Sequence, residues 1–301
     1  MKSRMIRRGL FACTLALLAA SSFAQLTQSA LWAVEAETHY NYAPNTTYIS
    51  AGGVELKLDL YTRRDVNTPQ PTLIFFHGGF WVAGSKDVQL TALMPWLEKG
   101  WNVVNVGYRL GGVAVAPAAV VDAHCALRWA GANAAMYNID TSRIVASGQS
   151  AGGHLALTLG MADAAGFDDA CPAGDTPRVA AVINWFGVTD VADVIAGPNY
   201  NEVPAGWFAG IPEAEALVLA KTLSPMTYVR DDLPPILTIQ GDADMVVPYA
   251  QGLALHNALA KTNTKNLLLT IPGGGHGRFT AGERAMIYEV INGFLTQNGL
   301  E

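Results

Sequence analysis

The pentapeptide Gly148-Gln149-Ser150-Ala151-Gly152 is the feature that most constrains the fold of this chain. It follows an apolar run at 144–146 and precedes apolar residues at helical spacing over 153–157. A G-x-S-x-G motif between a strand and a helix forms a tight turn that exposes the serine hydroxyl at the edge of a sheet. The helix N-terminus beside it can stabilise an oxyanion. We therefore predict that Ser150 is a nucleophile; ordinary packing of small residues is the alternative.

Apolar runs alternate with segments of helical periodicity along most of the chain. The predicted buried strands are 72–76, 102–106, 143–147, 179–185, 236–240 and 266–271, and the predicted helices are 87–99, 117–137, 151–161, 249–261 and 281–297. Such alternation predicts an α/β fold with a mostly parallel sheet and helices on both faces. Short strands at 48–50 and 54–61 suit antiparallel pairing at one edge, and 189–232 is predicted to be an insertion.

The N-terminus has the features of a secretory signal. Four basic residues, Lys2, Arg4, Arg7 and Arg8, precede an apolar stretch at 10–20 that is too short to span a bilayer as a stable helix. We predict a signal peptide at 1–24, cleavage after Ala24, one mature domain at 25–301, and secreted or periplasmic localisation. An uncleaved N-terminal anchor is the rival interpretation.

Charge and cysteine content restrict the partners. Cleavage removes those four positive charges and lowers the formal net charge from −6 to −10. An acidic chain without a basic run argues against nucleic acid and anionic membranes as partners, and we expect no membrane insertion after cleavage. Cys125 and Cys171 could form one disulfide in an oxidising compartment, or remain separate buried thiols. Two cysteines make no metal-ligand set, and no metal or organic cofactor is predicted.

A serine nucleophile needs a general base and an orienting acid, which in this fold class follow it in the order acid, then histidine. His276 lies in a glycine-rich turn after the strand 267–271 and is the predicted base. The loop after 236–240 carries two carboxylates. We assign Asp244 as the catalytic acid and Asp242 to hydrogen bonds within the turn.

The segment His77-Gly78-Gly79-Phe80-Trp81 ends the strand 72–76 and is predicted to complete an oxyanion hole. Its N–H donors would come from Gly79 and Phe80, together with Ala151 after the nucleophile. His77 is expected to fix the loop rather than to move a proton.

Several aromatic residues fall on or near predicted loops. Trp81, Trp185 and Phe279 are the candidate substrate-binding residues, and packing in the core or in the insertion is the alternative for each.

Four motifs in this order resemble the α/β-hydrolase superfamily: His77 to Trp81, Gly148 to His154, Gly241 to Pro248, and Gly275 to Gly277. They are most similar to esterases with an HGG-type oxyanion loop, the carboxylesterase, acetyl esterase and feruloyl esterase branch, over about residues 50–298. The resemblance implies an α/β-hydrolase fold with a small cap-like insertion. Phe80 stands where a related pattern has a third glycine, which leaves ester and amide substrates both open.

The predicted protein is a secreted serine esterase that hydrolyses short-chain acyl or aryl (feruloyl) esters through an acyl-enzyme. Its substrates would be small molecules or esters linked to polysaccharides. An amidase of the arylformamidase or prolyl-oligopeptidase-like type is the alternative enzyme. A non-catalytic binding protein on a hydrolase scaffold is the alternative outside catalysis. The sequence leaves the oligomeric state open.

Overall fold

The computed structural model describes residues 27–163 and 165–301, so the predicted signal peptide lies outside the described residues. The strands are β1 (Tyr40–Ala51), β2 (Val54–Arg63), β3 (Gln70–Phe76), β4 (Asn102–Val106), β5 (Ile139–Gln149), β6 (Ala181–Trp185), β7 (Ile236–Gly241) and β8 (Asn266–Ile271). The longer helices are α2 (Gln28–His39), α3 (Leu90–Glu98), α4 (Ala118–Ala132), α6 (Ala151–Met161), α10 (Tyr249–Leu259) and α11 (Ala281–Gln297).

All eight strands form one sheet in the order β1-β2-β4-β3-β5-β6-β7-β8. The β1–β2 and β2–β4 pairs are antiparallel, and every other neighbouring pair is parallel. The predicted α/β class with an antiparallel edge is thus confirmed. The parallel arrangement brings the carboxyl ends of β3, β5, β7 and β8 to one edge of the sheet.

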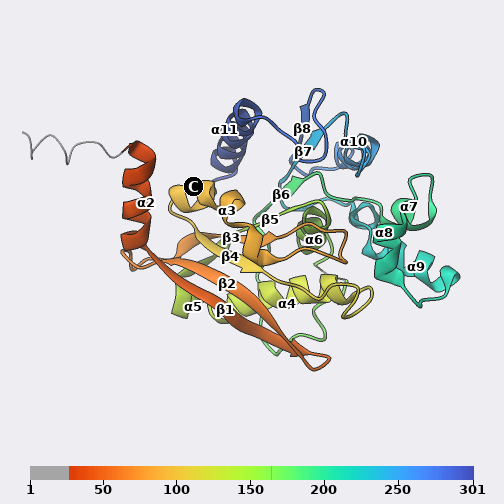
Figure 1. Ribbon diagram of the computed structural model, residues 1–301, viewed down its shortest axis with the longest axis horizontal. Coiled ribbons are helices and arrows are strands. Elements are labelled where there is room, and N and C mark those ends of the chain that lie inside the picture. Colours follow the sequence, from red (N-terminus) through yellow and green to blue (C-terminus); the bar gives the residue numbers. More distant parts are fainter. Residues whose placement is uncertain (1–26, 164) are drawn as a thin grey trace, which may run out of the picture.

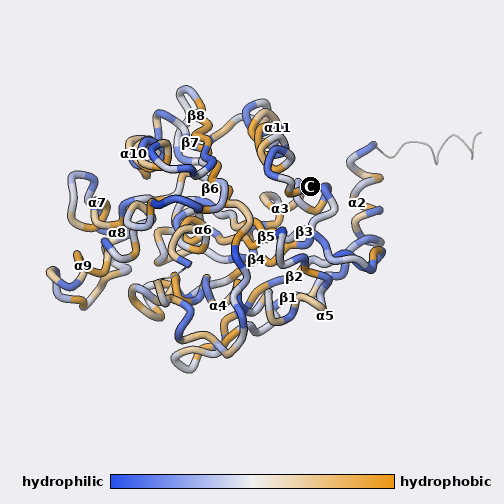
Figure 2. The backbone as a smooth tube through the Cα atoms, turned by 180° about the vertical axis from the view of Figure 1, so that it is seen from behind, coloured by the Kyte–Doolittle hydropathy of each residue, from blue (hydrophilic) through white to orange (hydrophobic). Residues whose placement is uncertain are grey.

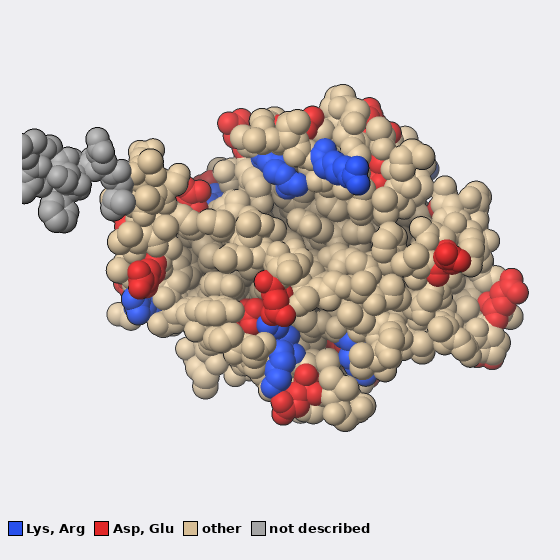
Figure 3. All heavy atoms as spheres, in the orientation of Figure 1, with Lys and Arg blue, Asp and Glu red and all other residues tan. Residues whose placement is uncertain are grey.

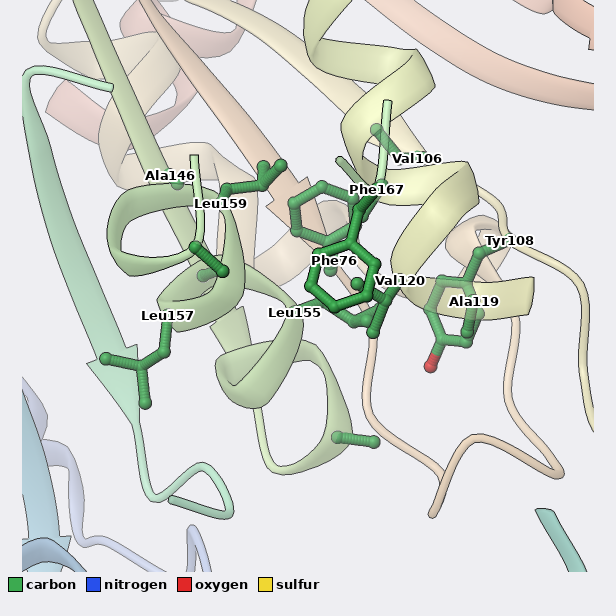
Figure 4. Close-up of a cluster of buried hydrophobic side chains, with 14 of the residues drawn as sticks. Phe76, Val106, Tyr108, Ala119, Val120, Ala146, Leu155, Leu157, Leu159 and Phe167 are labelled. Carbon is green, nitrogen blue, oxygen red and sulfur yellow. The ribbon is translucent and has the colours of Figure 1, made fainter. Parts of the chain in front are cut away.

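Two hydrophobic clusters fill the spaces on either side of the sheet. Helices α4, α6 and α10 contribute to the larger cluster, and α3 and α11 contribute to the other. In Figure 4, Phe76 of β3 lies among Val120 of α4, Leu155 of α6 and Phe167 from the loop after α6. The tube in Figure 2 shows hydrophobic colouring along the central strands and the helix faces toward them. Both faces of the parallel strands are therefore covered, which explains why most of their residues are apolar.

Helix α2 stands at the β1–β2 end of the molecule, beside α3 (Figure 1). None of its residues is fully buried. Thr27 accepts a hydrogen bond from the N–H of Ala30 and caps the helix at its start.

The insertion predicted at 189–232 lies between β6 and β7. It is largely helical and contains α7 (Val191–Ala196), α8 (Glu202–Ala205), η2 (Gly206–Phe208), α9 (Glu213–Leu223) and η3 (Pro225–Tyr228). Figure 1 shows this group at the end of the molecule opposite α2.

A disulfide joins Cys125 of α4 to Cys171 in the loop that follows α6. Near it, Arg128 forms an ion pair with Asp168 and donates a hydrogen bond to the hydroxyl of Thr176. The disulfide and these polar contacts together attach the loop to α4.

Among residues 27–163 and 165–301, no helix has both the length and the hydropathy that crossing a bilayer demands. The same residues contain no group of three or more His, Cys, Asp or Glu side chains able to hold a metal ion. On the face shown in Figure 3, charged side chains of both signs form small separate groups with wide uncharged areas between them.

Candidate active site

Ser150 occupies the sharp turn between β5 and α6. Its backbone has φ 56° and ψ −119°, a left-handed φ that costs a non-glycine residue free energy and is characteristic of functional turns. The N–H of Ser150 donates to the carbonyl of Trp185 at 2.9 Å, which ties the turn to the end of β6. The strained turn holds the nucleophile in one position at the sheet edge.

The two flanking glycines are required by close packing. A Cβ on Gly148 would lie 2.3 Å from the carbonyl oxygen of Gly152, and one on Gly152 would lie 2.1 Å from the carbonyl oxygen of Phe76. Any larger residue would push α6 away from β3 and β5. The small residues of the motif therefore serve the turn itself and are not incidental.

The loop after β7 and the loop after β8 meet at His276. The Nδ1 atom of His276 lies 2.8 Å from Oδ2 of Asp244, whose side chain is fully buried. The other oxygen, Oδ1 of Asp244, accepts hydrogen bonds from the N–H groups of Val246 and Val247 at 2.8 and 3.0 Å. The carboxylate is thus fixed in orientation, and it holds the proton of His276 on Nδ1, which leaves Nε2 free to act as a base.

Asp242 has the other role predicted for this loop. Its Oδ1 accepts a hydrogen bond of 2.6 Å from the N–H of Gly273 and so connects the two loops. It makes no hydrogen bond with His276 among the residues that the structure describes. The geometry favours Asp244 over Asp242 as the residue that orients the imidazole.

Phe186 places His276 close to the nucleophile turn. The rings of Phe186 and His276 meet edge to face with centroids 4.6 Å apart, and Phe186 directly follows Trp185, the acceptor for Ser150 N–H. Phe186 also has a positive φ of 42°. The sequence could have pointed to Phe186 as a site residue, because it directly follows the strand β6. The predicted site contained its neighbour Trp185 instead.

Within the described part of the chain, no hydrogen bond joins the hydroxyl of Ser150 to His276. Catalytic hydrogen bonds are often long without substrate and shorten in the reacting complex. The Asp244–His276 hydrogen bond is thus already formed in the structure, and a missing Ser150–His276 hydrogen bond is compatible with the predicted catalytic pair.

The loop after β3 lies against the nucleophile. A Cβ on Gly78 would be 3.4 Å from Cβ of Ser150, and the next three residues, Gly79, Phe80 and Trp81, all have positive φ. Three consecutive residues of positive φ form a tight turn beside Ser150, which is where the predicted oxyanion hole has to lie. Ala151 is the first residue of α6, so its N–H has no acceptor within the helix.

His77 stabilises this loop through contacts with Gly78 and Tyr108. Its Nδ1 lies 2.8 Å from the carbonyl oxygen of Gly78, its own carbonyl accepts a hydrogen bond from the hydroxyl of Tyr108, and the two rings stack at 4.3 Å. Burial lowers the pKa of His77. The contacts agree with the predicted role of fixing the loop.

Trp81 differs from the expectation that it contacts the substrate. Only 1% of Trp81 is exposed, and its indole N–H donates to Nδ1 of His154 at 3.1 Å. It stacks on Trp207 of the insertion with centroids 4.6 Å apart. Trp81 therefore has almost no free surface for a substrate and anchors the oxyanion loop, because its left-handed backbone points the side chain inward.

Trp185 and Phe279, the other two candidates for substrate binding, are also buried. Trp185 packs near Tyr288, and Phe279 packs against Phe186 and under the guanidinium of Arg284. Trp185 accepts the hydrogen bond from Ser150 N–H, and Phe279 contacts Phe186, so both lie close to the site. Their side chains are nevertheless covered by protein.

Gln240 is a supporting residue that was not predicted from the sequence. Its side-chain amide donates to the carbonyl of Val247 at 2.8 Å from a fully buried position at the end of β7. Val247 is one of the two N–H donors to Asp244, so Gln240 fixes the position of the loop that carries Asp244. A glutamine in an otherwise apolar strand was the signal that could have revealed it.

A serine at the β5–α6 turn, with an acid after β7 and a histidine after β8 on this sheet, defines the α/β-hydrolase class. The chain belongs to the BD-FAE family, whose profile matches residues 58–259. This finding confirms the resemblance to esterases of the HGG type.

Curated relatives are named as esterases. Esterase LipC of Mycobacterium tuberculosis is 31% identical over 234 residues, which is 73% of this chain and 56% of LipC. Esterase LipQ of the same organism is 30% identical over 274 residues, which is 85% of this chain and 63% of LipQ. The chain thus spans less than two thirds of the length of each of these relatives.

Solved esterase structures share the fold over nearly their whole length. A truncated carbohydrate esterase from gut microbiota has a TM-score of 0.73 at 30% identity, with 87% of this chain and 98% of that chain covered. Esterase 2 of Thermogutta terrifontis, solved with propionate bound, has a TM-score of 0.71 at 26% identity, covering 85% and 94%. The same esterase has been solved phosphorylated by paraoxon.

Proposed function

We propose that this protein is a carboxylic ester hydrolase that works through an acyl-enzyme on Ser150. The observation that carries the proposal is the Asp244–His276 hydrogen bond at the sheet edge that also holds the strained Ser150 turn. The esterase names of the relatives and of the similar structures support it.

In the proposed reaction, Ser150 Oγ attacks the ester carbonyl carbon while Nε2 of His276 removes the hydroxyl proton. Asp244 stabilises the imidazolium through Nδ1–H. The N–H groups of Ala151 and of Gly79 or Phe80 bind the developing oxyanion. His276 then returns the proton to the leaving alcohol, and a water activated by the same nitrogen hydrolyses the acyl-enzyme.

The finer substrate class is also a proposal. One similar structure, an esterase solved with propionate bound, supports short acyl groups, and another, a carbohydrate esterase, supports esters linked to sugars. The resemblance of the oxyanion loop to the feruloyl esterase branch supports feruloyl esters. Short-chain acyl and feruloyl esters are therefore the first substrates to test.

Export from the cytoplasm is proposed on the basis of the disulfide. A Cys125–Cys171 bridge is favoured in an oxidising compartment, which supports the secreted or periplasmic localisation expected from the N-terminal sequence. Fractionation of cells that express the full chain tests it: recovery of the uncut chain in the cytoplasm would contradict export.

The activity is tested with purified protein and a panel of p-nitrophenyl esters of rising acyl length, methyl ferulate, acetylated xylan, a formylated aniline and short peptides. We expect ester hydrolysis that Ser150→Ala reduces by about 10⁴-fold or more, with the circular dichroism spectrum unchanged. Paraoxon should label the wild type and not the variant. Equal ester turnover in both proteins would refute the assignment, and faster cleavage of the anilide than of any ester would favour an amidase.

A further inference from the structure

A cavity lies at the β1–β2 end of the sheet, and no residue of the candidate active site lines it. It has a volume of about 600 Å³ and lies between α2, α3 and the strands β1, β2 and β4. Trp32 of α2, three tyrosines of β1 and β2, and the polar side chains of Asp59 and Asn105 form much of its lining. A cavity of this size accommodates a small molecule.

The floor of the cavity offers hydrogen-bond acceptors without donors. Asp59 of β2 and Asn105 of β4 are directly opposite in the antiparallel register, so their side chains lie on the same face of the sheet. Asn105 is 2% exposed, and its Oδ1 has no hydrogen-bond partner among the described residues. Asp59 uses only Oδ1, and its Oδ2 likewise has no partner in the part of the chain that the structure describes.

Lys86 lies between the carboxylates of Asp59 and Asp87 and has no proton left for a ligand. Its ammonium, buried to 7% exposure, donates to Asp59 at 2.7 Å, Asn45 at 2.9 Å and Asp87 at 2.9 Å. The amide of Asn105 also donates, to the backbone carbonyl of Lys86. An unpaired, almost fully buried amide oxygen is costly unless water or a ligand donates to it.

The walls are aromatic. Tyr42 stacks on Tyr61 with centroids 4.7 Å apart, and Trp32 faces the same space from α2. Tyr40 donates its hydroxyl proton to the carbonyls of Leu97 and Trp101, so it presents its ring rather than a free donor. Flat apolar walls above a floor of acceptors match a ligand that is apolar on one face and carries hydroxyl groups.

From this arrangement we propose that the cavity is a second binding site, for a neutral polyhydroxylated ring such as a sugar unit. Two adjacent hydroxyl groups would donate to Oδ1 of Asn105 and Oδ2 of Asp59, while the ring packs on the aromatic walls. An anion is disfavoured, because the lining carries the carboxylates of Glu37, Asp59 and Asp87 against the single ammonium of Lys86. The unpartnered oxygen of Asn105 requires a hydroxyl or N–H donor, which a quaternary ammonium lacks. The site is independent of Ser150 and of the proposed ester hydrolysis.

The test uses Ser150→Ala protein, so that binding at the ester site is not followed by reaction. The probes are the methyl glycosides of glucose, xylose and galactose, measured by saturation-transfer NMR and calorimetry. Tetra-O-methyl glucoside, which lacks hydroxyl donors, and tetramethylammonium serve as comparison ligands. We expect at least one methyl glycoside to bind and both comparison ligands to fail.

Two variants on the same helix locate the binding. Trp32→Ala removes one wall, and Val34→Ala, which is 54% exposed and does not line the cavity, is the matched control. Trp32→Ala should weaken the affinity for the glycoside by about tenfold, equivalent to about 1.4 kcal/mol, and Val34→Ala should not change it. Tyr42→Ala, also at a half-exposed position, should weaken it in the same way.

Three results would overturn the proposal. They are no binding of any glycoside, binding that Trp32→Ala and Tyr42→Ala leave unchanged, and tighter binding of tetramethylammonium than of the glycosides. The binding is measured with a protein that lacks the Ser150 hydroxyl. Its outcome is therefore independent of the outcome of the esterase assay.

Discussion

The indole rings of Trp81 and Trp207 stack with their centroids 4.6 Å apart, although one belongs to the loop after β3 and the other to the insertion between β6 and β7. The carbonyl of Trp207 also accepts a hydrogen bond from the N–H of Ala116. At this point the insertion is part of the packing that supports the oxyanion loop, rather than a separate cover.

Trp207→Ala should therefore affect both stability and activity. Trp207 is fully buried, so its truncation should lower the free energy of unfolding by about 3–5 kcal/mol. The loss of support for Trp81 should also lower kcat by about tenfold or more, because misplaced N–H donors bind the oxyanion poorly. Denaturation curves and ester kinetics measure the two effects. Val218→Ala, at a 68% exposed position of α9, should change stability by less than about 0.5 kcal/mol; equal effects of the two variants would contradict this account.

Asp244→Asn should reduce kcat by about 10³–10⁴-fold, because an amide cannot stabilise the imidazolium and favours the wrong tautomer of His276. Asp242→Asn is the matched control in the same loop, since its amide oxygen can still accept the hydrogen bond from Gly273. It should retain activity within about threefold. If Asp242→Asn proved the more damaging change, the assignment of the acid would be reversed.

Gly78→Ala should impair catalysis more than folding. The new methyl group would lie 2.9 Å from the carbonyl of Gln149 and 3.4 Å from Cβ of Ser150, so it would displace the nucleophile turn from the oxyanion loop. We expect kcat to fall by about 10²-fold, since small misplacements in an active site are costly. Gly112→Ala, where a methyl group meets nothing within 4 Å, should behave as wild type. Similar kinetics for both variants would show that the loop tolerates the methyl group.

His154 should make the fold sensitive to acid. Burial lowers its pKa from 6.5 to about 4, while Nε2 is hydrogen-bonded to the carbonyl of Leu223 and Nδ1 accepts from Trp81. Between pH 6.5 and 4 the unfolded chain binds a proton that the folded imidazole does not, so stability falls as the pH decreases. The contribution of this residue is at most about 3 kcal/mol.

His154→Gln retains an acceptor and a donor but cannot titrate, so unfolding curves from about pH 7 to about pH 4 should show a smaller loss of stability for the variant than for the wild type. An identical pH dependence for both would mean that other groups cause the acid sensitivity.

Removal of the disulfide should lower stability by up to about 4 kcal/mol, as expected for cysteines that are 46 residues apart. The double variant Cys125→Ser/Cys171→Ser should have a lower melting temperature than the wild type. Dithiothreitol should lower the melting temperature of the wild type but not that of the variant. If dithiothreitol left the melting temperature of the wild type unchanged, this result would argue against the disulfide.

The parallel part of the sheet and the order of the three catalytic candidates could be predicted because each depends on a local pattern. Buried parallel strands such as β3 and β7 are mostly apolar, and the helices between them have clear periodicity. The disulfide could be expected only from the compartment, since its geometry depends on how α4 meets a distant loop.

The antiparallel edge was less predictable. Strand β1 begins at Tyr40, not at residue 48. Pro44 and Asn45, whose φ is 55°, lie at an irregularity inside the strand, and a proline in a short run is a weak signal for a strand. Helix α2 was not predicted, since it buries no residue and so has no apolar stripe. In β2 the polar Asp59 alternates with the apolar Leu58 and Leu60, yet the structure buries it against Lys86.

The candidate substrate-binding residues show a different limit. Trp81 lies in the loop as predicted, yet its side chain turns into the core, because two consecutive left-handed residues, Phe80 and Trp81, reverse the chain there. No sequence pattern encodes that reversal. The partner that makes it favourable, Trp207, comes from more than a hundred residues away.

Strand β8 is the last strand of the sheet and is bonded to β7 alone, and it is the strand that carries His276 in the loop at its end. Edges of sheets open more readily than their centres. Gentle heating or dilute denaturant should therefore abolish turnover while most of the amide protons in the middle strands still resist exchange with deuterated solvent. Inactivation and melting should be two separate events in this protein.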